Sequence, residues 1–210
     1  MQIKNKDKLN DGTALPLMEE FYSLQGEGFH TGKAAYFLRI GGCDVGCNFC
    51  DVKESWDKAR HSLVEVDEIV AHILDSKADS VVVTGGEPCL YNLDYLCQSL
   101  KKQHILLHIE TSGTEHISGE WDWICFSPKN KTVILPEFYK IANELKIIVE
   151  TKEDFAWAEQ NASKIHADCL CYLQPEWSQF ERITPLIVDY ILQNPQWKIS
   201  LQSHKYMRIP

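Results

Sequence analysis

The sequence has little of what marks a membrane-spanning, secreted or nucleic-acid-binding protein. None of its apolar runs approaches the roughly 20 residues that cross a bilayer, and its polar start, MQIKNKDKLNDG, lacks the apolar core of a signal peptide. Acidic residues outnumber basic ones, 30 to 21, which gives a formal net charge of −9. Such a balance disfavours a surface that holds nucleic acid by its phosphates. We therefore expect a cytoplasmic protein with no membrane or nucleic-acid partner.

Linkers and repeats are also missing. The chain contains no low-complexity tract, no internal repeat and no stretch rich in proline and glycine that would separate two domains. Its 210 residues are enough for one domain with a sizeable core and too few for two ordinary ones. We expect residues 1–210 to form a single domain.

Eight cysteines are present, but they do not suggest a disulfide scaffold, because a reducing compartment keeps thiols free. Five of them have apolar neighbours, as small buried hydrophobic residues do. These are Cys89, Cys97, Cys125, Cys169 and Cys171. The other three stand together in the polar loop GGCDVGCNFCD, at positions 43, 47 and 50.

Short β-rich runs alternate with runs of helical period along the chain. Apolar side chains share one helical face in residues 66–74, 93–100 and 183–191. The strand candidates are AAYFLRI, SVVVT, ILLHIE, WICFS, LKIIVE, CLCYLQ and WKISLQ. This alternation predicts an α/β fold on a mostly parallel sheet, either open or closed into a barrel.

Nearly every predicted strand runs into a segment rich in polar residues or glycine. GGCDVGC follows the first strand, GGEP the second and TSG the third, and later strands lead into PKN, PEW and SHK. Parallel α/β folds bring the carboxyl ends of their strands to one rim, where ligands bind. Polar loops alone would explain the glycines and prolines, but less well the concentration of Cys, Glu, Lys, Gln and His. We expect these residues to meet in one site.

Three thiolates separated by three and two residues can turn inward from one tight loop, in which Gly41, Gly42 and Gly46 supply backbone freedom. A structural zinc site needs four protein ligands, and no fourth Cys or His lies near the loop in the sequence. Three cysteines can instead hold three irons of a 4Fe–4S cluster and leave the fourth iron open to a further ligand. The spacing favours the cluster, while zinc and unmetallated cysteines remain alternatives.

The loop Cys43-x-x-x-Cys47-x-Phe49-Cys50 resembles the cluster motif of the radical S-adenosylmethionine (SAM) enzymes. TGGEP, residues 84–88, resembles a second element of that superfamily, although alone it could be an ordinary turn. The resemblance implies a partial, open TIM-like barrel of parallel strands, smaller than the eightfold closed form. It also implies SAM as a cofactor and a 4Fe–4S cluster held by the three cysteines. A dry cavity would let the 5′-deoxyadenosyl radical meet substrate and not solvent.

Further segments resemble one family within this superfamily, the 7-carboxy-7-deazaguanine synthases. They are YSLQGEG, FLRIGGCDVGCNFCD, TGGEP, ETSG, SPK, YLQP and the carboxyl-terminal LQSHKYMRIP. The match begins near residue 19, so we expect residues 1–18 to form an amino-terminal extension and residues 19–210 the core. The resemblance implies a carbon–nitrogen lyase that converts 6-carboxy-5,6,7,8-tetrahydropterin to 7-carboxy-7-deazaguanine and releases ammonia, on the path to queuosine and related 7-deazapurines.

The resemblance also implies a SAM-binding set at the ends of successive strands. Its members are Phe49, Cys50, Asp51, Gly86, Glu87, Glu110, Ser127, Pro128, Lys129, Gln174 and Pro175. Residues 49–51 match the adenine site, while Glu110 and the Ser-Pro-Lys run suit the ribose hydroxyls and the methionine carboxylate. For Lys129, a solvated position in a loop is the alternative.

A substrate-binding set is implied in the same way. Its members are Leu24, Gln25, Gly26, Glu27, Arg39, Thr84, His204 and Pro210. An amide and a carboxylate suit the donor-rich edge of a pterin, and a guanidinium suits a substrate carboxylate. A surface turn at residues 26–28 and an internal salt bridge of Arg39 are the alternatives. In the family the terminal carboxylate, here that of Pro210, receives the pterin amino group, and proline stiffens its approach.

One position departs from the family pattern. Two residues after the last cluster cysteine, the family usually carries a Thr or Ser that binds Mg²⁺, and this chain has Val52. Magnesium prefers hard oxygen ligands. Either Asp51, Ser55 or water replaces the hydroxyl, or the ion is not used in the same way. We expect weak or absent dependence on magnesium.

The resemblance implies a homodimer and an electron donor such as flavodoxin. Two other functions are compatible with parts of the sequence. A glycyl-radical-enzyme activating protein has similar length and the same cysteine spacing, but it would not need QGEG or the terminal proline. A non-enzymatic zinc-binding module would also carry a cysteine loop, and its metal content would separate it from an iron–sulfur enzyme.

Overall fold

A nine-stranded sheet forms the centre of the computed structural model, which describes residues 7–130 and 132–210. Its strands are β1 (Ala14–Leu24), β2 (Ala34–Ile40), β3 (Ser62–Glu65), β4 (Ser80–Gly85), β5 (Leu106–Thr111), β6 (Trp123–Phe126), β7 (Glu144–Val149), β8 (Leu170–Pro175) and β9 (Trp197–Ile199). Their order in space is β3-β1-β2-β4-β5-β6-β7-β8-β9. All seven strand candidates from the sequence are strands of this sheet.

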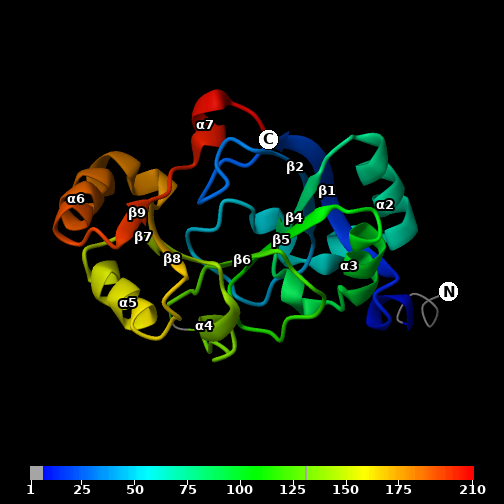
Figure 1. The fold of residues 1–210 in the computed structure, drawn as a ribbon, viewed down its shortest axis with the longest axis horizontal. Helices are drawn as coiled ribbons and strands as arrows, with labels where there is room; N and C mark the ends of the chain where they lie inside the picture. The colour runs from blue at the N-terminus through cyan, green and yellow to red at the C-terminus, as the bar shows by residue number, and fades with distance from the viewer. Residues whose placement is uncertain (1–6, 131) are drawn as a thin grey trace.

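Neighbouring strands from β2 to β9 are parallel, whereas β1 is antiparallel to both β2 and β3. The sheet curls into a partial barrel (Figure 1). Its edge strands, β3 and β9, do not pair with each other within the described residues, so the barrel is open. The predicted open α/β barrel is therefore confirmed. At one end the sheet is extended by β1 and β3, and β1 is antiparallel to both of its neighbours.

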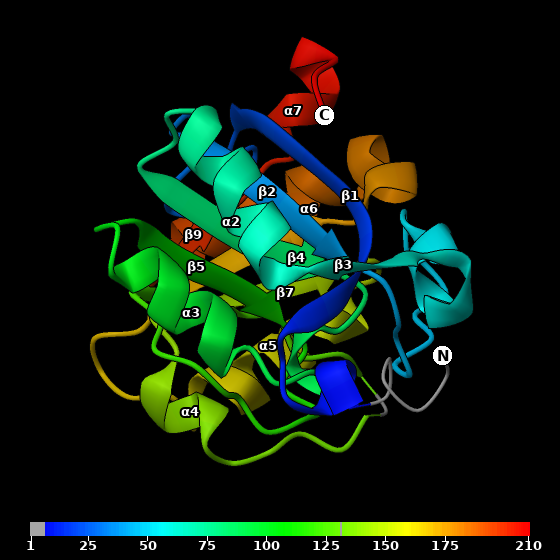
Figure 2. The same cartoon turned by 90° about the vertical axis from the view of Figure 1, so that its right-hand side faces the viewer.

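The longer helices cover the outer face of the sheet. They are α2 (Val66–Asp75), α3 (Asp94–Lys101), α5 (Glu153–Ala162) and α6 (Phe180–Gln193). The shorter helices lie in the segments that connect or follow the strands; they are α4 (Phe138–Ile141), α7 (Ser203–Met207) and the 3₁₀ helices η1 (Lys53–Trp56), η2 (Lys58–Arg60), η3 (Pro88–Leu90) and η4 (Trp177–Gln179). Figure 2 shows α2 and α3 in front of the strands, where Ile69 and Leu96 join the main apolar core. The three predicted helices are confirmed. In the described part of the chain, no helix has the length and apolar character needed to cross a membrane.

The first strand begins at Ala14, inside the segment that we expected to be an extension. Residues 14–17 pair with β3, and the following residues of β1 pair with β2. β1 and β3 fall outside the predicted strands because ALPLMEEFYSL and SLVE mix charged and apolar residues without a regular run. The sheet therefore includes part of the expected extension.

The cysteines divide as predicted. All eight are free thiols, and the five with apolar neighbours are buried. The three in the loop after β2 are only half-buried. This confirms that the chain uses five cysteines as core residues and leaves three for another purpose.

The carboxyl-terminal segment crosses the open side of the barrel. Figure 1 shows α7 between β9 and the end of the sheet formed by β1 and β2. The N–H and the Oγ of Ser203 both donate to the carbonyl of Gly26, at 2.9 and 3.0 Å. Ser23 Oγ donates to an oxygen of the Pro210 carboxyl group at 3.4 Å. The end of the chain thus contacts the segment around the end of β1.

Candidate active site

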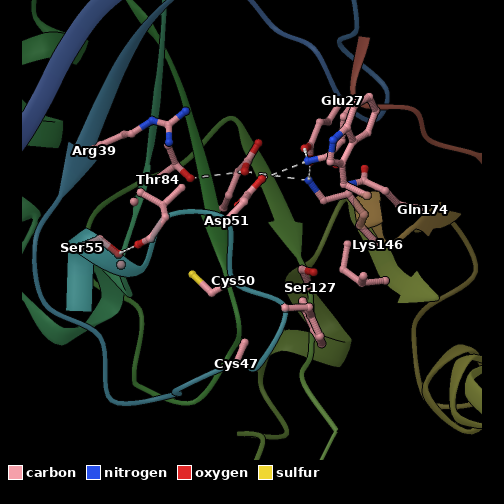
Figure 3. A pocket seen from close by; sticks show the side chains of 18 of the residues that line it. Glu27, Arg39, Cys47, Cys50, Asp51, Ser55, Thr84, Ser127, Lys146 and Gln174 are labelled. Carbon is pink, nitrogen blue, oxygen red and sulfur yellow. Dashed lines mark hydrogen bonds and ion pairs between the residues drawn. The ribbon is translucent and has the colours of Figure 1, made fainter. Parts of the chain in front are cut away.

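A cavity of about 530 Å³ lies at the carboxyl ends of the strands (Figure 3). Its wall contains residues that follow β1, β2, β4, β5, β6, β8 and β9, so the predicted convergence of the strand ends is confirmed. The three loop cysteines and every member of the two predicted binding sets line it, with the exception of Pro128. Pro128 is buried but does not reach this wall.

The cysteine loop and the TGGEP turn are joined by their backbones. The N–H of Gly86 donates to the carbonyl of Ile40, and the N–H of Glu87 donates to the carbonyl of Gly42, each at 2.8 Å. A Cβ on Gly86 would collide with the carbonyl of Gly42 and lie 3.3 Å from Cys43 Cβ. Only glycine fits this close approach. The glycine turn therefore lies directly against the cysteine loop.

The three loop cysteines face the cavity, and burial raises the pKa of Cys43 and Cys47. Thiols of this kind bind metal as thiolates and release their protons when they do so. Among residues 7–130 and 132–210, no three His, Cys, Asp or Glu side chains converge closely enough to hold one metal ion. A 4Fe–4S cluster does not need such convergence, because each thiolate binds a different iron. Three half-buried cysteines at the cavity are therefore compatible with the thiolate ligands of a cluster.

Glu87 stabilises the turn and does not offer its carboxylate to a ligand. The residue is 1% exposed, and its carboxylate accepts hydrogen bonds from Cys89 N–H, Thr111 Oγ1, and the N–H and Oγ of Ser112. These bonds join the turn after β4 to the end of β5. A contact of Glu87 with SAM is therefore restricted to its backbone.

Two residues of the predicted SAM-binding set are oriented by neighbouring hydroxyls. Lys129 Nζ donates to Ser127 Oγ at 2.6 Å, and Gln174 Oε1 accepts from Ser200 Oγ at 2.6 Å. Burial lowers the pKa of Lys129. This lysine is half-buried at the cavity wall, so the alternative of a solvated loop position does not describe it.

Residues 25–33, which we call the floor segment, run from the cavity wall to the inner face of the sheet. Phe29 stacks on Trp123 with 4.8 Å between ring centroids, and its N–H donates to Glu144 Oε2 at 3.0 Å. Gly28 adopts a φ of +63° and donates its N–H to Ser200 Oγ at 2.9 Å. Because these contacts hold the segment against β6 and β7, residues 26–28 are not the surface turn that we considered as the alternative.

Arg39 lies on β2 and lines the cavity (Figure 3). Its Nε is 3.1 Å from Glu19 Oε1, and its guanidinium lies 5.5 Å from the ring centroid of Phe21. The internal ion pair that we considered as the alternative is therefore present. The side chain of Glu19 is 46% exposed, so water screens this pair. The guanidinium remains a suitable partner for a ligand carboxylate.

Glu110 connects residues of the predicted substrate set. Gln25 Nε2 donates to Glu110 Oε1 at 3.1 Å, and Thr84 Oγ1 donates to Glu110 Oε2 at 3.3 Å. Lys146 Nζ forms an ion pair with Glu27 and lies 3.8 Å from Glu110 Oε2. Although the resemblance assigned Glu110 to the SAM-binding set, its contacts lie among the residues assigned to the substrate.

Three residues at the cavity were missed from the sequence: Lys146, Gln202 and Lys205. Lys146 stands inside the apolar strand ELKIIV, and a charge in such a strand is the sequence signal that could have found it. Gln202 Nε2 donates to Glu27 Oε1 at 2.9 Å. Lys205 Nζ donates to Asp51 Oδ2 at 2.8 Å. No sequence pattern marks the last two, because their partners are remote along the chain.

His204 and Pro210 reach the cavity from α7 and the chain end. A Cβ on Gly26 would collide with the imidazole of His204, so the ring packs directly on the floor segment. Burial lowers the pKa of His204, which favours the neutral ring. The chain end and the floor segment thus form one side of the cavity.

Half-buried cysteines beside a glycine turn, at the mouth of a partial α/β barrel, are the features of a radical SAM enzyme. A family model described as the Radical SAM superfamily matches residues 38–124, which include the cysteine loop and TGGEP. Membership of this superfamily implies a 4Fe–4S cluster and SAM, and the residues of the cavity fit both.

Similarity over the whole chain gives the family. The chain is 53% identical over 199 residues to a 7-carboxy-7-deazaguanine synthase from Flavobacterium psychrophilum, which covers 95% of this chain and 94% of that protein. It is 46% identical over 194 residues to one from Synechocystis, with 92% and 93% covered. The crystal structure of QueE from Escherichia coli matches with a TM-score of 0.82 at 30% identity, over 96% of this chain and 99% of that one. The chain belongs to the 7-carboxy-7-deazaguanine synthase family.

Proposed function

We propose that this enzyme converts 6-carboxy-5,6,7,8-tetrahydropterin to 7-carboxy-7-deazaguanine with release of ammonia, as a step towards queuosine or another 7-deazapurine. One observation carries the proposal: the floor segment, Arg39 and Pro210 line the same cavity as the cysteine loop. A substrate held by the first three is next to a cofactor held by the fourth. The cavity of about 530 Å³ has the size of small-molecule sites, about 300–1,000 Å³.

When bound, the cluster and SAM supply a 5′-deoxyadenosyl radical. Cys43, Cys47 and Cys50 would hold the cluster through their thiolates. The residues that we assign to SAM are Phe49, Cys50, Asp51, Gly86, the backbone of Glu87, Ser127, Lys129, Gln174 and Pro175. Since they follow different strands, they would hold SAM from several sides beside the cysteine loop.

The substrate is oriented by groups from four segments of the chain. Arg39 binds the substrate carboxylate, and Glu27 accepts hydrogen bonds from ring N–H groups. The terminal carboxylate of Pro210 receives the amino group, beside the neutral imidazole of His204. Leu24, Gln25, Gly26 and Thr84 complete the substrate-binding wall. Held in this way, the ring presents one C–H bond to the radical source.

We propose that turnover does not require magnesium bound in the family manner. The side chain of Val52 has no oxygen, and its carbonyl accepts a hydrogen bond from Ser55 Oγ at 2.7 Å. The carboxylate of Asp51 is bound by Lys205 at 2.8 Å and Gln202 at 3.4 Å. Position 52 therefore offers magnesium no side-chain oxygen, and the hydroxyl of Ser55 is already engaged within the protein.

We also propose a single-domain enzyme that works as a homodimer in the cytoplasm with an electron donor such as flavodoxin. Eight free thiols suit a reducing compartment. Trp177 and Tyr206 are 39% and 54% exposed and lie in contact, with 5.4 Å between ring centroids. Exposed aromatic pairs of this kind suit an interface with a second copy of the chain.

The test is anaerobic turnover of 6-carboxytetrahydropterin by the reconstituted enzyme with SAM and a reductant. We expect the deazaguanine and ammonia in equal amounts. A brown protein with four irons that makes no deazaguanine would contradict the proposed substrate. A colourless protein with one zinc per chain would contradict the whole proposal.

A further inference from the structure

Lys146 is a buried cation to which the proposed chemistry assigns no role. It is the third residue of β7, it is 4% exposed, and it lines the cavity (Figure 3). An ammonium is costly to bury unless carboxylates pair with it. A charge in this apolar strand therefore has to be explained by the groups that surround it.

Two carboxylates from distant parts of the chain meet this ammonium. Glu27 of the floor segment pairs with it, and Glu110 Oε2 of β5 lies 3.8 Å from it. Gln25 and Thr84 both donate to Glu110, at 3.1 and 3.3 Å. Three residues assigned to the substrate, Gln25, Glu27 and Thr84, thus reach Lys146 directly or through Glu110.

The charges in this group stabilise one another. Burial raises the pKa of Glu27, but the charge of Lys146 and hydrogen bonds from Lys146 and Gln202 outweigh it and lower the pKa to about 2. For Lys146, burial lowers the pKa, and the surrounding carboxylates outweigh this and raise it well above its usual value. At neutral pH the lysine is charged and Glu27 is ionised.

We propose that Lys146 is a positioning residue for substrate specificity, which keeps the carboxylates of Glu27 and Glu110 in place as two acceptors for ring N–H groups of the substrate. The identity of that ring rests on the proposed function. Each carboxylate oxygen has two lone pairs, so the contacts within the protein leave acceptor capacity for a ligand. Without the cation, the buried carboxyl group of Glu27 takes up a proton and places an O–H donor opposite an N–H group of the ligand, and Glu110 loses a contact that holds it in place.

Equilibrium binding of 6-carboxypterin, a fluorescent analogue, tests this role in the anaerobically reconstituted enzyme with SAM present. We expect Lys146→Met to weaken binding about 100-fold at pH 7, because two acceptors are lost. Binding to this variant, relative to wild type, should recover about tenfold between pH 6 and 8 as Glu27 ionises. A purely structural role for the lysine would give a loss that does not depend on pH.

Other titratable groups face the same site and remain unchanged in these variants. They are Cys125 on β6, Glu144 on β7, Lys129 after β6 and His204 on α7. The charge of Lys146 lowers the pKa of Cys125, Lys129 and Glu144, so Lys146→Met acts on these groups as well. Lys146→Arg keeps the charge and therefore separates the effect of charge from that of the side chain's shape. The matched control is Lys198→Met, which removes an exposed lysine of β9 that does not line the cavity and should leave binding unchanged.

Lys146→Arg keeps the charge, so its binding should stay within about tenfold of wild type and show no added pH dependence. Wild-type affinity in Lys146→Met would overturn the inference, as would a pH-independent loss or an equal loss in Lys146→Arg. If the Met variant does not fold, Glu110→Gln and Lys146→Arg are used for the test instead. Ligand binding to Glu110→Gln should be about tenfold weaker than to wild type, and unchanged binding to this variant would overturn the inference. Failure of the wild type to turn over the tetrahydropterin is a separate result, which contradicts the proposed function.

Discussion

Glu87 shows how one residue can support the site without its side chain touching a ligand. Its carboxylate accepts hydrogen bonds from Cys89, Thr111 and Ser112, while its N–H holds Gly42 of the cysteine loop. The turn after β4, the end of β5 and the cysteine loop are fixed together through this one residue.

We expect Glu87→Gln to lower the free energy of unfolding by about 2–3 kcal/mol, because the amide places an N–H group opposite buried donors. Urea unfolding of the two proteins measures the difference. Glu120→Gln, at an exposed position, is the matched control and should change stability by less than about 0.5 kcal/mol. An equal effect of both changes would contradict the role that we give to Glu87.

The valine at position 52 predicts that turnover does not depend on magnesium. Turnover should stay within about twofold when EDTA removes magnesium, because no hydroxyl is available at this position to bind the ion. Val52→Thr, which restores the family's residue, should show activity that magnesium increases. Loss of wild-type turnover in EDTA, with return only on addition of Mg²⁺ and with the cluster intact, would contradict the expectation.

At the scale of elements, the floor segment depends on an apolar and aromatic contact with the inner face of the sheet. His30 stacks on His108 at 4.4 Å and packs edge-on against Trp123 at 4.6 Å. Neither ring nitrogen of His30 has a hydrogen-bond partner among the described residues. Burial lowers the pKa of His30, and it lowers that of His108 to about 4. Both rings are therefore neutral where the floor segment meets the sheet.

This pair should make stability depend on pH. In the unfolded chain His108 binds a proton near pH 6.5, whereas in the folded protein it does so only at about pH 4. The free energy of unfolding is therefore highest above pH 6.5 and decreases as the pH falls towards 4, because protons favour the unfolded chain over this range. We expect a loss of about 1–2 kcal/mol, after allowance for partial solvent screening. His108→Phe should reduce this loss in urea unfolding at pH 7 and pH 5. His116→Phe, at an exposed position, should not; an unchanged loss in His108→Phe would contradict the account.

The chain end gives a prediction for a second element. One glycine added after Pro210 should reduce turnover by at least about 100-fold, because it moves the carboxylate by one residue, about 3.5 Å. Iron content and the effect of SAM on the cluster should not change. The same residue added before Met1 is the control. Full activity of the carboxyl-terminal variant would remove the terminal carboxylate from the substrate-binding set.

Elements were predictable from the sequence where one face of a strand or helix is uniformly apolar. The strand SVVVT and the helix in residues 66–74 are of this kind, since burial against the core determines their pattern. β1 and β3 were not predictable, because neither strand has a uniformly apolar face. Residues of β1 line the cavity, and β3 is an edge strand. The motif loops identified most of the cavity wall. Lys205 and Gln202 could not be found, because only the folded chain places α7 beside the cysteine loop.

At the scale of the whole molecule, an open barrel allows two different ligands to meet. The parallel strands β2 to β9 bring their carboxyl ends to one rim, while α7 crosses the open side (Figure 1). The cysteine loop and the chain end thereby face the same cavity from opposite ends of the sequence. A closed barrel would leave no gap in the sheet for the tail to cover.

The central claim is that the three loop sulfurs hold a 4Fe–4S cluster with one iron open to SAM. Electron paramagnetic resonance of the reduced, anaerobically reconstituted enzyme, with iron counted per chain, tests it most directly. We predict four irons per chain and a spectrum that changes when SAM is added. A protein that binds no iron, or a cluster whose spectrum is the same with and without SAM, would contradict the claim.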